Sequence, residues 1–215
     1  MSSVTIVDYG IGNLLSVQRA CEYFGADVIF ADTPEKIKQA ERLILPGVGA
    51  FADGMAGLRQ RALIEPIRQY AKQDRPFMGI CLGMQMMLDV GEEFGIHEGL
   101  GLIPGKVIKI ANTGVDGQVH KIPYIGWNTL SMPSDNTIWE GTAFNGIEPG
   151  NAVYFVHSFT AVPAKDEHRF ADSYYDGRII SAAIRSGNLY GCQFHPEKSG
   201  PIGLKIIENF TNIHE

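Results

Sequence analysis

A cysteine between two glycines offers the strongest chemical signal in this chain. The run Gly-Ile-Cys-Leu-Gly at residues 79–83 places Cys81 after an apolar segment and before a helical one. This spacing is the thiol form of the nucleophile elbow, a sharp turn from strand to helix that exposes the nucleophile. The glycines leave room for the turn, and the N–H of Leu82 at the helix start can donate to an oxyanion. Taken alone, Cys81 fits a nucleophile and an inert buried cysteine equally well.

One of the six histidines offers a base for that thiol. His195 lies in the run Gln-Phe-His-Pro-Glu at residues 193–197, directly after a predicted strand. Pro196 biases His195 toward an extended backbone. Glu197 then returns to the same side, where it can orient the imidazole. A lone His-x-Glu pair is typical of a surface, but beside Cys81 in an α/β pattern it favours a catalytic triad of Cys81, His195 and Glu197.

A glycine-rich turn could complete the site. Residues 45–51 read Leu-Pro-Gly-Val-Gly-Ala-Phe and follow a predicted strand, so the N–H of Val48 can pair with that of Leu82 as an oxyanion hole. The spacing of Gly47, Gly49 and Ala52 also fits a dinucleotide loop loosely, but this is not the first strand-to-helix turn and the triad would stay unexplained. No His, Cys, Asp or Glu cluster has metal-ligand spacing, and we expect no metal and no cofactor.

The elements that must position these residues alternate in the first half of the chain. Apolar runs predict strands, and amphipathic stretches predict helices at 13–24, 34–40 and within 57–72; the strands are expected at 4–7, 28–30, 43–45 and 77–80. The second half predicts further strands joined by turns at 176–177 and 186–188, and a last helix at 202–212; these strands are expected at 106–110, 153–156, 178–180 and 189–194. The pattern predicts an α/β fold, a mainly parallel sheet flanked by helices with a nucleophile elbow, as a single domain over residues 1–215.

Composition limits the class of partner. The chain has 215 residues and a net charge of −6, which argues against nucleic acid as its main partner. Its three cysteines are far apart, which favours reduced thiols, with Cys21 and Cys192 in the core. The first residues lack a signal-peptide pattern, and no apolar stretch reaches the roughly 18 residues that span a bilayer. We therefore expect a soluble cytoplasmic protein with no membrane partner.

The motifs together resemble the class I (triad) glutamine amidotransferases. The resemblance rests on Gly-Ile-Cys-Leu-Gly-Met-Gln at 79–85 and Phe-His-Pro-Glu at 194–197, and it extends over almost the whole chain. Within this class the chain most resembles the glutaminase subunits of histidine biosynthesis. The segments that support this narrower resemblance are residues 8–14, 46–49, 126–128, 154–159 and 193–200.

This resemblance implies a reaction and a substrate site. Cys81 would attack the side-chain amide of L-glutamine, and His195, oriented by Glu197, would protonate the leaving ammonia and then activate water. Gln85, one helical turn beyond Cys81, would face the substrate. The family places the remaining glutamine contacts at Gly47, His157, Ser158 and Phe159.

The resemblance also implies a partner. The family docks as a heterodimer on a (βα)8-barrel synthase subunit, which receives the ammonia, and glutaminase activity awaits the loaded synthase. Reorientation of the Val48 peptide would be the switch. The expected interface residues are Asn13, Trp127, Tyr154 and Lys198, although Trp127 and Tyr154 could also be core aromatics.

One departure from the family pattern leaves the ammonia acceptor open. Where the family has His-Met before Gly-Trp-Asn, this chain has Tyr124 and Ile125, expected close to the docking surface. The acceptor could therefore be a surface-polysaccharide sugar that receives an amidine, rather than the histidine-pathway intermediate. The motifs are also compatible with a catalytically silent regulatory subunit and with a partner-free hydrolase of γ-glutamyl peptides.

Overall fold

The centre of the molecule is a seven-stranded sheet with the order β11-β12-β13-β4-β3-β1-β2. The structure is a computed structural model that describes residues 2–134 and 137–213. Five neighbouring strands, β2, β1, β3, β4 and β13, pair in parallel. The last two strands, β12 and β11, are added next to β13 with antiparallel pairing and form one edge of the sheet. The strands are β1 (Ser3–Val7), β2 (Asp27–Ala31), β3 (Leu43–Gly47), β4 (Phe77–Cys81), β11 (Arg169–Tyr175), β12 (Arg178–Ser186) and β13 (Leu189–Cys192).

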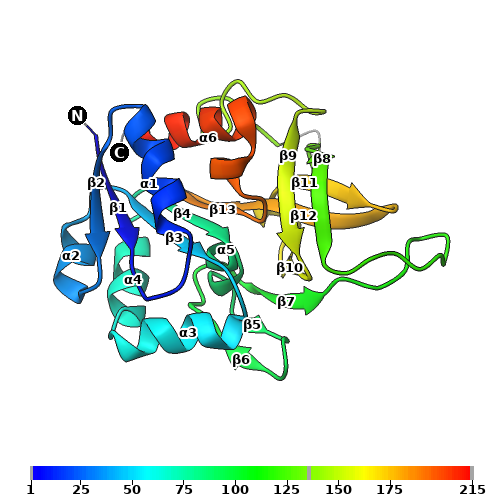
Figure 1. Cartoon of the computed structure of the whole chain (residues 1–215), viewed down its shortest axis with the longest axis horizontal. Coiled ribbons are helices and arrows are strands. Elements are labelled where there is room, and N and C mark those ends of the chain that lie inside the picture. The colour runs from blue at the N-terminus through cyan, green and yellow to red at the C-terminus, as the bar shows by residue number, and fades with distance from the viewer. Residues whose placement is uncertain (1, 135–136, 214–215) are drawn as a thin grey trace.

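Helices cover both faces of this sheet (Figure 1). On one face α1 (Leu14–Tyr23) and α6 (Gly200–Asn212) bury apolar side chains at helical spacing, such as Val17 and Cys21 of α1. The other face packs against the remaining helices, α2 (Pro34–Gln39), α3 (Phe51–Gln60), α4 (Ile64–Ala71) and α5 (Leu82–Met86). The predicted fold class is confirmed, because most of the sheet is parallel and buried on both sides.

Two smaller sheets extend the second half of the chain. One has the order β10-β7-β5-β6 and the other pairs β8 with β9. Their strands are β5 (Val90–Gly91), β6 (His97–Glu98), β7 (Gly105–Lys109), β8 (Tyr124–Thr129), β9 (Ala152–His157) and β10 (Phe159–Pro163), and the short 3-10 turns are η1 (Asp166–His168) and η2 (Pro196–Lys198). Strand β9 carries its last residues toward the carboxyl end of β4, where Val156 O lies 3.9 Å from Cys81 Sγ.

Most predicted elements are present, with differences at their ends. The helix expected within 57–72 is two helices, α3 and α4, because the backbone at Ala62 adopts a left-handed φ of 55°. Strand β13 ends at Cys192, two residues before the predicted end. Five strands were not predicted: β5, β6, β8, β10 and β11. Both predicted turns are confirmed, since residues 176–177 join β11 to β12 and residues 186–188 join β12 to β13.

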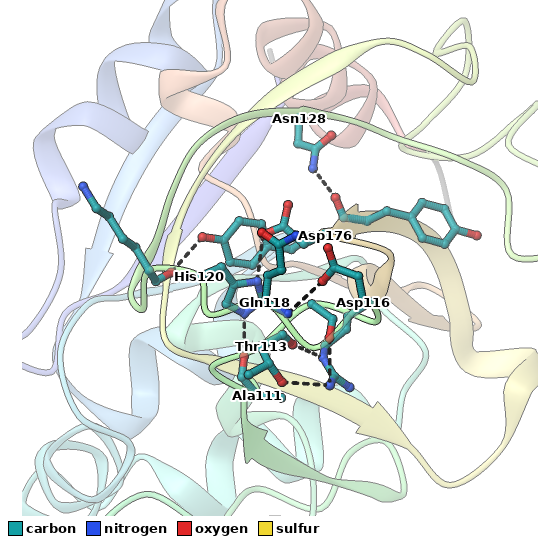
Figure 2. Close-up of polar contacts among 12 residues, drawn as sticks. Ala111, Thr113, Asp116, Gln118, His120, Asn128 and Asp176 are labelled. Carbon is teal, nitrogen blue, oxygen red and sulfur yellow. Dashed lines mark hydrogen bonds and ion pairs between the residues drawn. The ribbon is translucent and has the colours of Figure 1, made fainter.

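An arm formed by residues 111–121 follows β7 and projects from the body (Figure 1). His120 holds it against the β11–β12 hairpin, with Nδ1 2.8 Å from an Asp176 oxygen and Nε2 2.6 Å from Ala111 O (Figure 2). Arg178 also donates to Thr113 O. The His120 ring stacks on Tyr175 at 4.2 Å, so polar and aromatic contacts fix the base of the arm.

The cysteines follow the expectation for the core. Cys21 and Cys192 are fully buried, and all three cysteines are free. Over residues 2–134 and 137–213, no helix has the length and apolarity that crossing a membrane would require.

Candidate active site

The turn between β4 and α5 has the geometry of a nucleophile elbow. Cys81 adopts φ 54° and ψ −109°, a sparsely populated backbone conformation for a residue with a side chain. A Cβ at Gly83 would lie 1.7 Å from Leu45 O, and one at Gly79 would lie 2.7 Å from the Met84 nitrogen. Both glycines are therefore needed by the close approach of backbone at this turn.

His195 reaches the elbow because β13 runs beside β4. The parallel register pairs Cys192 with Ile80, so the chain leaves β13 at the level of Cys81. The His195 N–H then donates to Tyr154 O at 3.0 Å, which attaches this segment to β9. Its ring Nδ1 lies 2.8 Å from a carboxylate oxygen of Glu197, whose side chain is only 1% exposed. The His-Pro-Glu segment thus holds an imidazole and a carboxylate together, as its spacing predicted.

The other ring nitrogen of His195 is the one available for chemistry. Nε2 is buried and makes no well-formed hydrogen bond with the described residues. Burial lowers the pKa of His195, but the neighbouring Cys81 and Glu197 side chains raise it more, to about 9. The imidazole therefore carries a proton at neutral pH, the one that the neighbouring thiol would give up to it.

A second histidine, His157, is shifted in the opposite direction. Burial, with a smaller effect of the nearby His195, lowers its pKa to about 4, although the hydrogen bond to Phe159 O acts in the opposite direction. That bond is 2.7 Å long, and a carbonyl only accepts, so Nδ1 carries the hydrogen and Nε2 is a bare acceptor. His157 is thus a neutral ring beside a charged one.

Most of the residues predicted to act on a substrate line one cavity of about 480 Å³. This volume is in the range of small-ligand sites. The predicted residues that line it are Val48, Cys81, Leu82, Gln85, His157, Ser158, Phe159 and His195. Glu197 lies behind His195, in a small pocket that it shares with Gly47 and Asn13. A Cβ at Gly47 would lie 2.5 Å from the Tyr9 hydroxyl, so packing alone requires glycine there.

Sequence reasoning missed several residues of this cavity. Glu93, Pro123 and Val156 also line it, and Gln193 contacts the thiol from behind. Glu93 is the only carboxylate among the described lining residues, and it also accepts a hydrogen bond of 2.8 Å from the Phe51 N–H at the start of α3. Nothing near Glu93 in the sequence marks it, because a short hairpin brings it to the elbow. Gln193 lies within the recognised motif but has no chemical signature of its own.

The residues expected at a partner interface lie around the His195–Glu197 segment. Trp127 is 57% exposed, and the centroid of its ring lies 6.0 Å from that of Tyr154. The backbone carbonyl of Tyr154 accepts a hydrogen bond from the His195 N–H. Asn13 and Lys198 are exposed. These four residues form what we call the rim: Asn13, Trp127, Tyr154 and Lys198.

The departure at residues 124–125 is divided between core and surface. Tyr124 is buried, stacked on Tyr175 and Phe155 and edge-on to His157. Ile125 is 59% exposed. A docked partner could therefore contact the side chain of Ile125 but not that of Tyr124, which is covered by its aromatic neighbours.

No group of metal-ligating side chains occurs in the part of the chain that the structure describes. The site brings together a thiol, an imidazole and a carboxylate, with backbone N–H groups beside them. Such a set suits acyl transfer through a thioester.

The chain resembles known proteins in sequence and in fold. The family model for class-I glutamine amidotransferases matches residues 5–213. The structure also resembles that of PurLQS from Thermotoga maritima, with a TM-score of 0.73, 21% identity and 99% of each chain covered. A second solved structure, of a glutamine amidotransferase, has a TM-score of 0.72 at 14% identity over 97% of this chain and 99% of that one. The fold and the family match place this chain in the class-I glutamine amidotransferases.

Sequence relatives narrow the family. The chain is 58% identical to imidazole glycerol phosphate synthase subunit HisH 1 of Legionella pneumophila (strain Lens), over 99% of this chain and 100% of that protein. It is 42% identical to subunit HisH of Syntrophotalea carbinolica, over 98% of this chain and 100% of that one. The chain belongs to the HisH subunits of imidazole glycerol phosphate synthase.

Proposed function

We propose that this chain is the glutaminase subunit that hydrolyses L-glutamine to glutamate and ammonia and supplies the ammonia to the cyclase subunit of imidazole glycerol phosphate synthase in histidine biosynthesis. One observation carries the proposal. A strained cysteine at a strand-to-helix elbow lies beside a buried His195–Glu197 pair, at the wall of a cavity of small-ligand size. We further propose that residues 1–215 act as one glutaminase domain.

The reaction divides into acylation and deacylation. In the first step Cys81 Sγ, whose proton is held on His195 Nε2, attacks the side-chain amide carbon of glutamine. The N–H groups of Leu82 and Val48 would hold the resulting oxyanion. The imidazolium then gives its proton to the amide nitrogen, the carbon–nitrogen bond breaks, and ammonia leaves a glutamyl thioester.

Deacylation reverses the role of the imidazole. Neutral His195 removes a proton from water, and the hydroxide attacks the thioester carbon. The thiolate of Cys81 leaves, glutamate is released, and the protonated His195 is restored. Glu197 keeps Nδ1 hydrogen-bonded throughout, so that Nε2 always faces the reacting atoms.

The amino-acid end of the substrate would be held by other residues of the cavity wall. Glutamine carries an α-ammonium group, and Glu93 is the one carboxylate among the described residues of the cavity wall. We propose that Glu93 binds this ammonium and that backbone groups at Ser158 and Phe159, with Gln85 and Gly47, fix the rest of the molecule.

The ammonia must reach its acceptor without entering water, because ammonium is not nucleophilic. The proposed partner is a cyclase subunit of (βα)8-barrel fold, docked as a heterodimer on the rim. The products there would be imidazole glycerol phosphate and AICAR. HisH relatives at 58% and 42% identity support this acceptor over a polysaccharide sugar. The widely spaced free cysteines support a cytoplasmic location.

The test replaces the nucleophile. Cys81→Ala should abolish glutamate release from glutamine, measured with and without the loaded cyclase subunit, while leaving folding and docking intact. Cys21→Ala is the matched control, because it removes a thiol from α1 outside the cavity. Residual turnover of Cys81→Ala at the wild-type rate would overturn the assignment.

Two further outcomes distinguish this function from its rivals. A wild-type chain that releases no glutamate even with an intact loaded cyclase would be a silent regulatory subunit. Fast partner-free turnover of γ-glutamyl peptides would indicate an independent hydrolase.

A further inference from the structure

The side-chain amide of Gln193 is a buried polar group beside the thiol that the mechanism above does not use. Gln193 is fully buried, and its Nε2 lies 3.8 Å from Cys81 Sγ. Its position follows from the sheet, because the register pairs Cys192 of β13 with Ile80 of β4. The next residues along, Gln193 and Cys81, therefore lie side by side at the elbow. The Gln193 N–H donates to Ala182 O at 2.9 Å, which anchors the backbone there.

A chain of hydrogen bonds determines which way this amide points. Phe159 O can only accept, so Gln85 turns its Nε2 toward that carbonyl, at 3.2 Å. The same Nε2 has a second hydrogen, which it donates to Gln193 Oε1 at 3.0 Å. Because Oε1 of Gln193 faces Gln85, its Nε2 must face Cys81.

The sulfur therefore lies between two groups that prefer different protonation states. Val156 O, 3.9 Å from Sγ, can only accept, and it favours the neutral S–H. Nε2 of Gln193 can only donate, and a donor stabilises a thiolate more than a thiol. Gln193 is the contact that opposes Val156.

We propose that Gln193 is a further catalytic residue of this site. Its amide, held in one orientation by Gln85, donates a hydrogen bond to Cys81 Sγ and stabilises the thiolate formed when the S–H bond breaks and the proton passes to His195 Nε2. The same bond stabilises the thiolate again when it leaves the thioester. Gln85 acts on the sulfur as a positioning residue. The inference rests on the proposed role of Cys81 as nucleophile.

Alkylation of Cys81 by iodoacetamide without glutamine tests this directly, because its rate at each pH follows the thiolate fraction. Gln193→Met keeps the length of the side chain and removes the donor. Gln193→Glu keeps the acceptor for Gln85 and turns a carboxylate toward the sulfur. We expect the midpoint of the pH–rate profile to rise by about one unit in Gln193→Met, and by more in Gln193→Glu.

The controls separate this effect from others. Cys81→Ala gives the background from the buried thiols, and Gln69→Met makes the same substitution at an exposed site on α4, where the midpoint should not move. A midpoint at the wild-type value in a folded Gln193→Met or Gln193→Glu overturns the proposal. Should neither variant fold, Gln85→Met decides, since loss of the fixed orientation should still raise the midpoint and an unchanged value rejects it. Alkylation of the wild type no faster than of Cys81→Ala at every pH would instead reject Cys81 as the nucleophile.

Discussion

Two histidines of one cavity hold opposite protonation states. The carboxylate of Glu197 and the thiol of Cys81 keep a proton on His195, whereas His157 is buried among aromatic rings with only a carbonyl for its Nδ1 hydrogen. A protonated His195 can serve as the acid that the leaving ammonia needs. A neutral His157 avoids a second positive charge beside it.

Histidine-selective NMR should resolve this contrast. We expect His195 to titrate at about 9 and His157 at about 4, on either side of the ordinary value of 6.5. Glu197→Gln should lower the pKa of His195, because it removes the negative partner of Nδ1. Two rings that titrate together near 6.5 would contradict the site electrostatics.

The same shifts predict how stability depends on pH. His195 binds its proton more tightly when folded, so its contribution to the free energy of unfolding is complete below about pH 6.5 and is lost as the pH rises through about 9. His157 resists protonation when folded, so its contribution is present above about 6.5 and is lost as the pH falls toward 4. The two contributions to the free energy of unfolding are therefore largest together near pH 6.5 and decrease toward pH 9 and toward pH 4.

Glu93 tests the proposed substrate pose. Glu93→Gln removes the charge that would pair with the α-ammonium of glutamine but keeps an oxygen for the Phe51 N–H. We expect KM for glutamine to rise by about tenfold or more, with a smaller change in kcat. Glu92→Gln is the matched control, since that neighbour pairs with Lys106 and does not line the cavity. If Glu93→Gln and Glu92→Gln had the same KM for glutamine, Glu93 would not bind the α-ammonium group.

At the scale of elements, the loop between β3 and α3 carries Val48, the proposed second oxyanion donor. Val48 is 41% exposed and lies between Gly47 and Gly49, the latter with φ of +95°. We propose that its peptide reorients to complete the oxyanion hole when the loaded partner is bound. The branched side chain of Val48 restricts that motion.

Val48→Gly should therefore raise partner-free glutamine turnover several-fold, measured as glutamate release from the isolated chain. Glycine lowers the conformational cost of the new peptide orientation. Val115→Gly makes the same change at an exposed position of the arm and should leave turnover unchanged. Should Val48→Gly turn over as slowly as the wild type, the switch would be rejected.

The elements differ in how far sequence predicts them, for physical reasons. The parallel strands of the central sheet are short apolar runs, as buried parallel strands must be, and they were predicted within one or two residues. The antiparallel strand β12 runs to Ser186, well beyond its predicted end at residue 180. Strand β11 was missed because it lies at an edge and mixes Arg169 and Asp172, which pair with each other, with aromatic residues. The break between α3 and α4 falls at Ala62, where no glycine or proline signals it.

The site shows the same division. The elbow and the His-Pro-Glu segment are each local, so spacing predicted the turn at Cys81 and the His195–Glu197 pair, and the apolar strand before each motif indicated that the two meet. Glu93 reaches the cavity only through the folding of the second half of the chain, and spacing along the sequence contains no trace of that contact. Long-range assembly is thus what the sequence pattern could not supply.

At the scale of the whole molecule, hydrogen bonds connect the His195–Glu197 segment to the rim. The Tyr154 N–H donates to Ser199 Oγ at 2.9 Å, and that hydroxyl in turn donates to His195 O at 2.6 Å. Trp127 packs beside Tyr154 and near Gly200. A partner that pressed on the rim would therefore act on the backbone that carries His195.

Trp127→Ala should weaken docking to the cyclase subunit by about 30-fold, as expected for an aromatic anchor at an interface. The change is measured by calorimetric titration of one subunit with the other. Tyr23→Ala is the matched control, because Tyr23 is 75% exposed at the far end of α1 from the rim. An unchanged pH profile of Cys81 alkylation in Trp127→Ala would show that the site itself is intact. If both variants bind the cyclase as tightly as the wild type, the rim is not the docking surface, and the ammonia must leave the cavity by another route.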